Sequence, residues 1–216
     1  MLDLHVPSQI GSLSHLKYLN LAWNYNLKGS IPPQLGNLSK LHCLDISFNL
    51  FEGNIPSQLG NHSNFQDLYH GEYKGGALKI DDGNQCLSNL ISLTHLHLSS
   101  IPNDLHTSHS WLQMIAKLPK LRELRLIDCS LSDHFILSLR PSKFNFSTCL
   151  LVFDLSWNTF TSSMILFQRV PYQIILACGC VRLSLQDLDL SGNQITGSLP
   201  DLSVFPSLKT LDLSEN

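Results

Sequence analysis

The sequence predicts an α/β-type solenoid, a right-handed superhelix with a parallel β-sheet along its concave side and a mostly irregular convex side. Three observations predict it. Hydrophobic residues recur in one fixed frame, most copies of the frame end in asparagine, and several copies are followed by a glycine and then a proline. Charged residues make up only 14% of the 216 residues, which argues against a disordered chain. The length suits a single domain over residues 1–216.

The repeated frame is L-x-x-L-x-x-L-x-L-x-x-N, in which isoleucine or phenylalanine can replace leucine. We count about eight copies and call the last position of each copy the ladder position. The ladder positions are Asn24, Asn49, Tyr73, Ile101, Cys129, Asn158, Asn193 and Asn216. Consecutive ladder positions are 23 to 29 residues apart, except for one step of 35 residues before Asn193. This period is typical of leucine-rich repeats.

Each L-x-L core predicts a short strand, because residues two apart point to the same side. One turn cannot bury its apolar face alone, whereas stacked turns with parallel strands share a continuous core. The ladder residue is expected to point inward and to bond loop backbone that has no strand partner. Cys129 can take this place as a small buried group with a weak S–H donor. The residues assigned this structural role are Asn24, Asn49, Cys129, Asn158, Asn193 and Asn216.

Glycine and proline follow the ladder position in several repeats. We expect Gly29, Gly53 and Gly197 to permit a tight turn. The residues Ile31-Pro32, Ile55-Pro56 and Leu199-Pro200 should then start an extended return segment. Two segments fit the frame poorly, and the sequence predicts irregular insertions near residues 71–86 and 164–182.

The outward positions of the predicted strands form the concave face, which is the usual binding surface of a solenoid. In the middle of the chain they carry a polar, aromatic and cationic cluster, and Tyr and Arg are enriched in binding hot spots. The candidate ligand-binding residues are Asp67, Tyr69, His95, His97, Glu123 and Arg125. A solvated sheet face without a partner is the alternative reading of the same positions. The aromatic residues Trp23, Phe48 and Trp157 should stand at the edge of this face.

No catalytic, metal or nucleic-acid site is predicted. The pair His95 and His97 could face a metal ion, but a third ligand is missing and Arg125 would repel a cation. The chain has no G-x-S-x-G, H-E-x-x-H or glycine-rich phosphate motif, so we expect neither an enzyme nor a cofactor. The net charge of −3 gives no indication of nucleic-acid binding.

Six cysteines are present, and none of them forms a C-x-x-C pair. We expect mostly free thiols, with Cys43 on the exposed sheet and Cys129 in the core. Three N-x-S/T sequons predict glycosylation at Asn37, Asn61 and Asn145 if the chain is secreted. The first two lie one repeat apart, where the return segment meets the next turn.

The segments "LKGSIPPQLGNLSKL" and "FEGNIPSQLGNHSNF" resemble the extracellular type of plant leucine-rich repeat, and "ITGSLPDLSVFPSL" carries a looser form. The middle of the chain, residues 76–100 and 110–147, resembles the ectodomains of plant receptor-like proteins, and the resemblance covers nearly the whole chain. It implies a full-length parent at the extracellular face of the plasma membrane. Such a parent would bind a peptide, elicitor or glycan and signal in defence through a co-receptor kinase.

This chain shows only repeats, without a signal peptide, a transmembrane helix or either solenoid cap. We therefore interpret it as a fragment whose own residues do not contact a membrane. Three alternatives stay open. They are an ectodomain fragment of a receptor kinase, a secreted protein similar to polygalacturonase inhibitors, and a truncated gene product without function.

Overall fold

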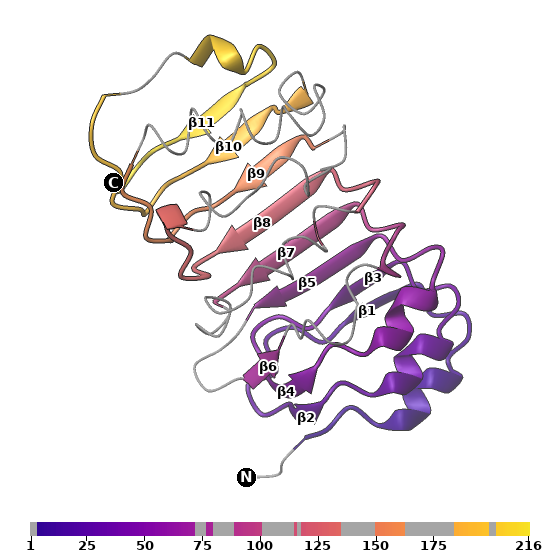
Figure 1. Cartoon of the computed structure of the whole chain (residues 1–216). Coiled ribbons are helices and arrows are strands. Elements are labelled where there is room, and N and C mark those ends of the chain that lie inside the picture. The colour runs from indigo at the N-terminus through magenta and orange to yellow at the C-terminus, as the bar shows by residue number, and fades with distance from the viewer. Residues whose placement is uncertain are drawn as a thin grey trace.

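The computed structural model describes residues 4–71, 77–79, 89–100, 115, 118–134, 150–162, 184–198 and 202–216. Their main feature is a parallel sheet of eight strands in the order β1-β3-β5-β7-β8-β9-β10-β11 (Figure 1). The strands are β1 (Tyr18–Asn20), β3 (Cys43–Asp45), β5 (Asp67–Gly71), β7 (His95–Ser99), β8 (Glu123–Ile127), β9 (Val152–Asp154), β10 (Asp187–Asp189) and β11 (Thr210–Asp212). Each strand starts six residues before a ladder position, so each repeat contributes one strand. The predicted solenoid with a parallel sheet is confirmed.

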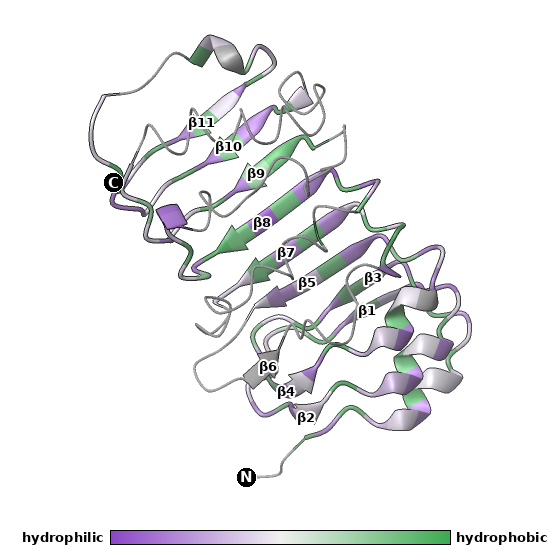
Figure 2. Ribbon diagram, in the orientation of Figure 1, coloured by the Kyte–Doolittle hydropathy of each residue, from purple (hydrophilic) through white to green (hydrophobic). Residues whose placement is uncertain are grey.

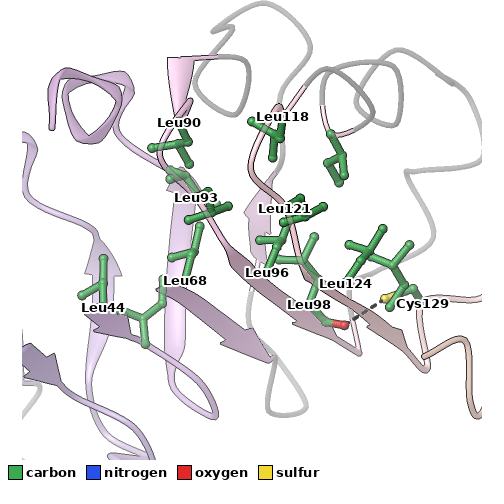
Figure 3. Close-up of a cluster of buried hydrophobic side chains, with 14 of the residues drawn as sticks. Leu44, Leu68, Leu90, Leu93, Leu96, Leu98, Leu118, Leu121, Leu124 and Cys129 are labelled. Atoms are coloured by element: carbon green, nitrogen blue, oxygen red, sulfur yellow. Dashed lines mark hydrogen bonds between the residues drawn. The ribbon is translucent and has the colours of Figure 1, made fainter. Parts of the chain in front are cut away.

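Rows of leucine run across the strands and form the core. Leu44 pairs with Leu68, and Leu96 pairs with Leu124, in one row that continues through the middle of the sheet. All four side chains are buried (Figure 3). The residues beside them point away from the core, so hydrophobic and hydrophilic bands alternate along β7 and β8 (Figure 2). Burial of each leucine stabilises the fold by about 1.5–3 kcal/mol, and the row makes the core continuous between repeats.

A second, smaller sheet joins β2 (Lys28–Ser30), β4 (Leu50–Asn54) and β6 (Ala77–Lys79), again in parallel. The structure differs here from the tight turn expected at the glycines. Gly29 and Gly53 lie inside β2 and β4 with φ of 82° and 79°, which a residue with a Cβ atom rarely adopts. β6 also shows that part of the insertion expected near residues 71–86 is regular sheet. The insertion expected near residues 164–182 lies outside the described residues.

Short 3-10 helices form the return side of several repeats. They are η1 (Ser8–Ser12), η2 (Pro33–Asn37), η3 (Ser57–Asn61) and η8 (Leu202–Val204), and η1 to η3 stack side by side (Figure 1). Pro32 precedes η2 in the expected extended conformation, and Leu35 points into the core. Gly36 allows the close stacking, because a Cβ atom there would lie 2.4 Å from Cβ of Gln58. None of the helices in the described part of the chain is long and apolar enough to cross a membrane.

Candidate functional site: the concave face

The structure brings together the six residues predicted to bind a ligand, which we call the central cluster. They occupy the outward positions of three neighbouring strands, β5, β7 and β8, and are half-buried. The register aligns them in two rows across these strands. One row contains Asp67, His95 and Glu123, and the other contains Tyr69, His97 and Arg125.

Both histidines of the central cluster contact a carboxylate on a neighbouring strand. His95 Nδ1 lies 2.6 Å from Asp67 Oδ1, and His97 Nε2 lies 2.6 Å from Glu123 Oε1. The ring of Tyr69 packs edge-on against the ring of His97, with centroids 4.5 Å apart. Within the described residues, no group of three His, Cys, Asp or Glu side chains is placed to hold a metal ion.

Arg125 connects the cluster to the next strand. Its Nε donates a hydrogen bond of 2.6 Å to Glu123 Oε1, and its Nη1 donates one of 3.0 Å to Asp154 Oδ2. Asp154 lies on β9 directly opposite Arg125 and is buried. The sequence prediction omitted Asp154 from the site. The repeat frame could have indicated Asp154, because this residue occupies the equivalent outward position of the next repeat and carries the charge opposite to that of Arg125.

Burial and the guanidinium of Arg125 together set the charge states of the cluster. Burial alone would raise the pKa of Glu123, but the hydrogen bond and charge of Arg125 outweigh it, and the pKa is lowered. Burial lowers the pKa of His97, and this effect exceeds the opposing effect of Glu123. Burial, assisted by the charge of Asp67, raises the pKa of Tyr69 to about 12. At neutral pH the cluster therefore presents a carboxylate, a neutral imidazole and a phenol beside one guanidinium.

These hydrogen bonds, and the ring contact of Tyr69 with His97, order the side chains of the central cluster without a ligand. Side chains that are already ordered lose less rotamer entropy when they bind a partner. His97 and Arg125 share the same carboxylate oxygen of Glu123. The concave face thus offers a preordered set of aromatic and polar groups over β5, β7 and β8.

The ladder residues lie behind this face and bond the backbone of adjacent turns. Asn158 Nδ2 donates to the carbonyl of Leu126 over 2.7 Å, and its Oδ1 accepts from the N–H of Cys129 over 3.0 Å. The same donation to the preceding turn occurs at Asn49, Asn193 and Asn216. Cys129 takes the ladder position of its own repeat, and its Sγ donates to the carbonyl of Leu98 over 3.5 Å (Figure 3). Asn24 is exposed, and its amide donates to the carbonyls of Leu21 and Ala22 in its own turn.

A row of left-handed backbone runs along the edge of the concave face. It contains the residues just before the ladder positions, namely Trp23, Phe48, Ser100, Asp128, Trp157, Gly192 and Glu215, all with φ between 51° and 63°. The rings of Trp23 and Phe48 stack with centroids 4.0 Å apart. The sequence reasoning placed the aromatic residues at this edge but missed the backbone conformation. Only for Gly192 does the residue type by itself indicate a left-handed conformation, because glycine adopts positive φ readily.

The predicted glycosylation sites and cysteines are only partly described. The exposed Asn37 ends η2, and Asn61 ends η3 one repeat further on. Asn145 and four of the cysteines (Cys86, Cys149, Cys178 and Cys180) lie outside the described residues. Neither Cys43 nor Cys129 is part of a disulfide. Burial, together with the nearby Asp67, raises the pKa of Cys43 to about 11, which keeps this thiol protonated.

Comparisons with known proteins agree with this architecture. A family model described as "Leucine-rich repeat region" matches residues 3–216. The receptor-like protein EIX1 of Solanum lycopersicum is 33% identical over 209 residues, which are 94% of this chain and 18% of EIX1. The chain thus spans less than a fifth of the length of this curated relative.

Solved structures of plant receptors share the fold. The Arabidopsis receptor kinase HAESA, in complex with the peptide hormone IDA and the co-receptor SERK1, is 29% identical with a TM-score of 0.59. That match covers 97% of this chain and 31% of the HAESA chain. PEPR1 in the PEPR1–AtPEP1 structure is 25% identical with a TM-score of 0.53, over 96% of this chain and 30% of that chain. The chain therefore belongs to the leucine-rich-repeat family, and it is similar to the ectodomains of plant receptor-like proteins.

Proposed function

We propose that this chain is a ligand-recognition segment of a plant cell-surface receptor-like protein and that its concave face binds an extended peptide. The observation that carries the proposal is the central cluster. Of six outward side chains on three adjacent strands, five are joined by hydrogen bonds and Tyr69 packs against the ring of His97, while the leucines between them only fill the core. A preordered face with Tyr and Arg near its centre is a suitable binding surface.

The wider role of the parent protein is part of the same proposal. We infer that it acts at the extracellular face of the plasma membrane in elicitor perception and defence, and that it signals through a co-receptor kinase. Support comes from the similarity to the receptor-like protein EIX1 and to HAESA, whose structure contains a peptide hormone and a co-receptor. A glycan ligand, a receptor-kinase parent and a secreted inhibitor of cell-wall enzymes are the alternatives.

Glycosylation at Asn37 and Asn61 fits an extracellular location. Both residues end helices on the return side of their repeats, so glycans there would leave the concave strands open. Asn145 is a third site of the same proposal. Secretion of the chain from plant cells followed by deglycosylation should reveal a shift in mobility that Asn37→Gln reduces.

The binding proposal is tested with a random peptide library displayed on phage and panned against the immobilised chain. Enriched peptides are synthesised and titrated against Tyr69→Ala and His95→Ala, two variants that leave the Arg125–Asp154 pair intact. We expect affinity to fall at least about tenfold, as for central interface residues. The control Glu52→Gln changes an exposed residue of β4 in the second sheet and should leave affinity unchanged. Equal binding by all variants would place the binding site elsewhere.

A further inference from the structure

A buried carboxylate lies beside the central cluster, at the end of β9. Asp154 is only 2% exposed, and a buried charge is costly unless it is paired and hydrogen-bonded. Its Oδ2 accepts a hydrogen bond of 3.0 Å from Arg125 Nη1. Its Oδ1 accepts two bonds from Ser156, one from the N–H over 2.9 Å and one from the hydroxyl over 2.7 Å. Ser156 therefore fixes the carboxylate through one oxygen, and the other oxygen holds Arg125.

The two bonds to serine belong to the turn that follows the strand, and the next repeat contains the same turn. Asp189 Oδ1 accepts from the N–H of Ser191 over 2.9 Å and from its hydroxyl over 2.7 Å. Among the described residues, no ion pair joins Asp189 to a cation. The turn thus forms without an arginine, so the contact between Asp154 and Arg125 is a separate feature of the face beside the central cluster.

Arg125 is held from two sides, because Glu123 lies on its own strand and Asp154 lies on the next one. Its Nε donates to Glu123 Oε1 over 2.6 Å, and its Nη1 donates to Asp154 Oδ2 over 3.0 Å. A guanidinium carries its donors in a rigid plane, so bonds at two of its nitrogens fix both its place and its orientation. Its Nη2 has no acceptor among the described residues, and 33% of the side chain is exposed. Arg125 can therefore donate from Nη2 to a ligand.

We propose that Asp154 is a positioning residue of the peptide site, which holds Arg125 so that Nη2 donates to an acceptor of the ligand, such as a peptide carbonyl. Asp154 acts without touching the ligand, since its side chain is buried. The effect extends beyond Arg125, because Arg125 and His97 share Glu123 Oε1 and Tyr69 packs on the ring of His97. This inference rests on the proposed function and adds to it a residue outside the central cluster.

Asp154→Asn tests the role with little change in volume. The amide oxygen still accepts from Ser156, but an NH₂ group replaces Oδ2 and faces the donor Nη1 of Arg125. The probe is a fluorescent library peptide whose binding depends on Tyr69. We expect Asp154→Asn to bind it about 2- to 12-fold more weakly, because Arg125 must then be ordered during binding. The control Asp189→Asn makes the same substitution in the same turn and should bind like the unmodified chain.

A second pair of variants keeps both carboxylates and decides the question if Asp154→Asn does not fold. Ser156→Ala removes the hydroxyl bond to Asp154 and leaves the bond from the N–H. Its control, Ser191→Ala, removes the same bond from Asp189. We expect Ser156→Ala to weaken peptide binding, by less than Asp154→Asn does, and Ser191→Ala to leave it unchanged.

A positioning role also predicts two results that a loss of stability alone would not produce. In the Arg125→Ala background, the further change Asp154→Asn should leave the affinity unaltered, because Asp154 acts through Arg125. In a chain with isotopically labelled arginine, Arg125→Lys identifies the NMR signal of Arg125 Nε–H. The order parameter of this N–H should be lower in Asp154→Asn than in the unmodified chain.

The inference is overturned if Asp154→Asn leaves the order of Arg125 unchanged, or if neither Asp154→Asn nor Ser156→Ala weakens binding relative to its control. It is also overturned if Asp154→Asn weakens binding equally when residue 125 is alanine. In each of these cases, peptides that depend on Tyr69 would still support the proposed function. If no library peptide depends on Tyr69, the proposed function fails, and the inference that rests on it fails too.

Discussion

At the scale of single residues, buried polar groups carry the most specific information in this chain. The ladder amides replace the hydrogen bonds that the backbone loses where each strand ends. Asn158 is a clear case, because it is buried and contacts the backbone of the turn before it through both its nitrogen and its oxygen. A residue of this kind cannot be exchanged for an apolar one without leaving buried backbone groups unsatisfied.

Asn158→Ala should therefore destabilise the chain by about 2–4 kcal/mol, since at least two buried backbone groups lose their partner. Asn24→Ala provides the matched control, because Asn24 is exposed and its amide donates to carbonyls of its own turn. Urea denaturation followed by circular dichroism measures both. Similar losses in the two variants would contradict the proposed role of Asn158.

The buried His70 should make the free energy of unfolding depend on pH. Burial lowers its pKa to about 4, whereas the unfolded chain has a histidine of ordinary pKa, about 6.5. Below pH 6.5 the unfolded state binds the proton first, so stability falls as the pH drops from 6.5 to 4, by about 3 kcal/mol at most. In His70→Leu this contribution should vanish and the pH dependence should flatten. Unfolding free energies at several pH values would disprove this assignment if both proteins showed the same slope.

At the scale of elements, the edge row of left-handed residues decides how neighbouring turns meet. The N–H of Trp23 donates to the carbonyl of Ser47, and the N–H of Trp157 donates to that of Ser191. These backbone hydrogen bonds join neighbouring repeats beyond the ends of the strands. The residues that donate them adopt a left-handed φ, which is unfavourable for a residue with a Cβ atom. Such a residue costs roughly 1–2 kcal/mol when it carries a Cβ atom, and its hydrogen bond offsets part of that cost.

Gly192→Ala tests this edge. An alanine here would have to adopt a φ of 62°, and its Cβ would lie 2.7 Å from the ring of Trp157. We therefore expect the free energy of unfolding to fall by about 2–3 kcal/mol. Gly53→Ala has a similar φ of 79° but nothing within 4 Å of its Cβ, and should lose only about 1 kcal/mol. The clash should disappear in Gly192→Ala/Trp157→Ala, which thermal unfolding can measure as a coupling between the two sites. Additive effects would exclude the contact.

At the scale of the whole molecule, each repeat is stabilised by its neighbours, because stacked repeats bury one shared core. Leucines of the middle strands have a neighbouring strand on both sides, whereas those of β11 have one on a single side of the described sheet. Leu96 is fully buried, but Leu211 is only partly buried. This difference follows from stacking, since all repeats share one frame.

Leu96→Ala should cost about 2.5–5 kcal/mol, because it leaves a cavity between two repeats. Leu211→Ala should cost less than half of that, since part of its surface is already in contact with solvent. Chemical denaturation of the two variants provides the comparison. Equal losses would show that the end of the sheet is as well packed as its middle.

The frame of leucines and asparagines was enough to predict the strands, their parallel order and the two rows of the central cluster. A period-2 strand inside a repeat of nearly constant length leaves only one register in which all leucines are buried. The second sheet was not predictable in this way. Two of its three strands contain a glycine with positive φ, and the short segments have no apolar alternation to indicate a strand.

The sequence by itself determined the solenoid, the core and the set of outward residues, because local spacing decides which side of a strand each residue occupies. Only the tertiary structure decided which charges meet. Arg125 binds Glu123 on its own strand and Asp154 on the next, whereas Asp189 and Asp212 meet serines and no cation among the described residues. Which charges pair depends on the length and orientation of side chains on neighbouring repeats. The distances between those side chains are set only when the repeats stack.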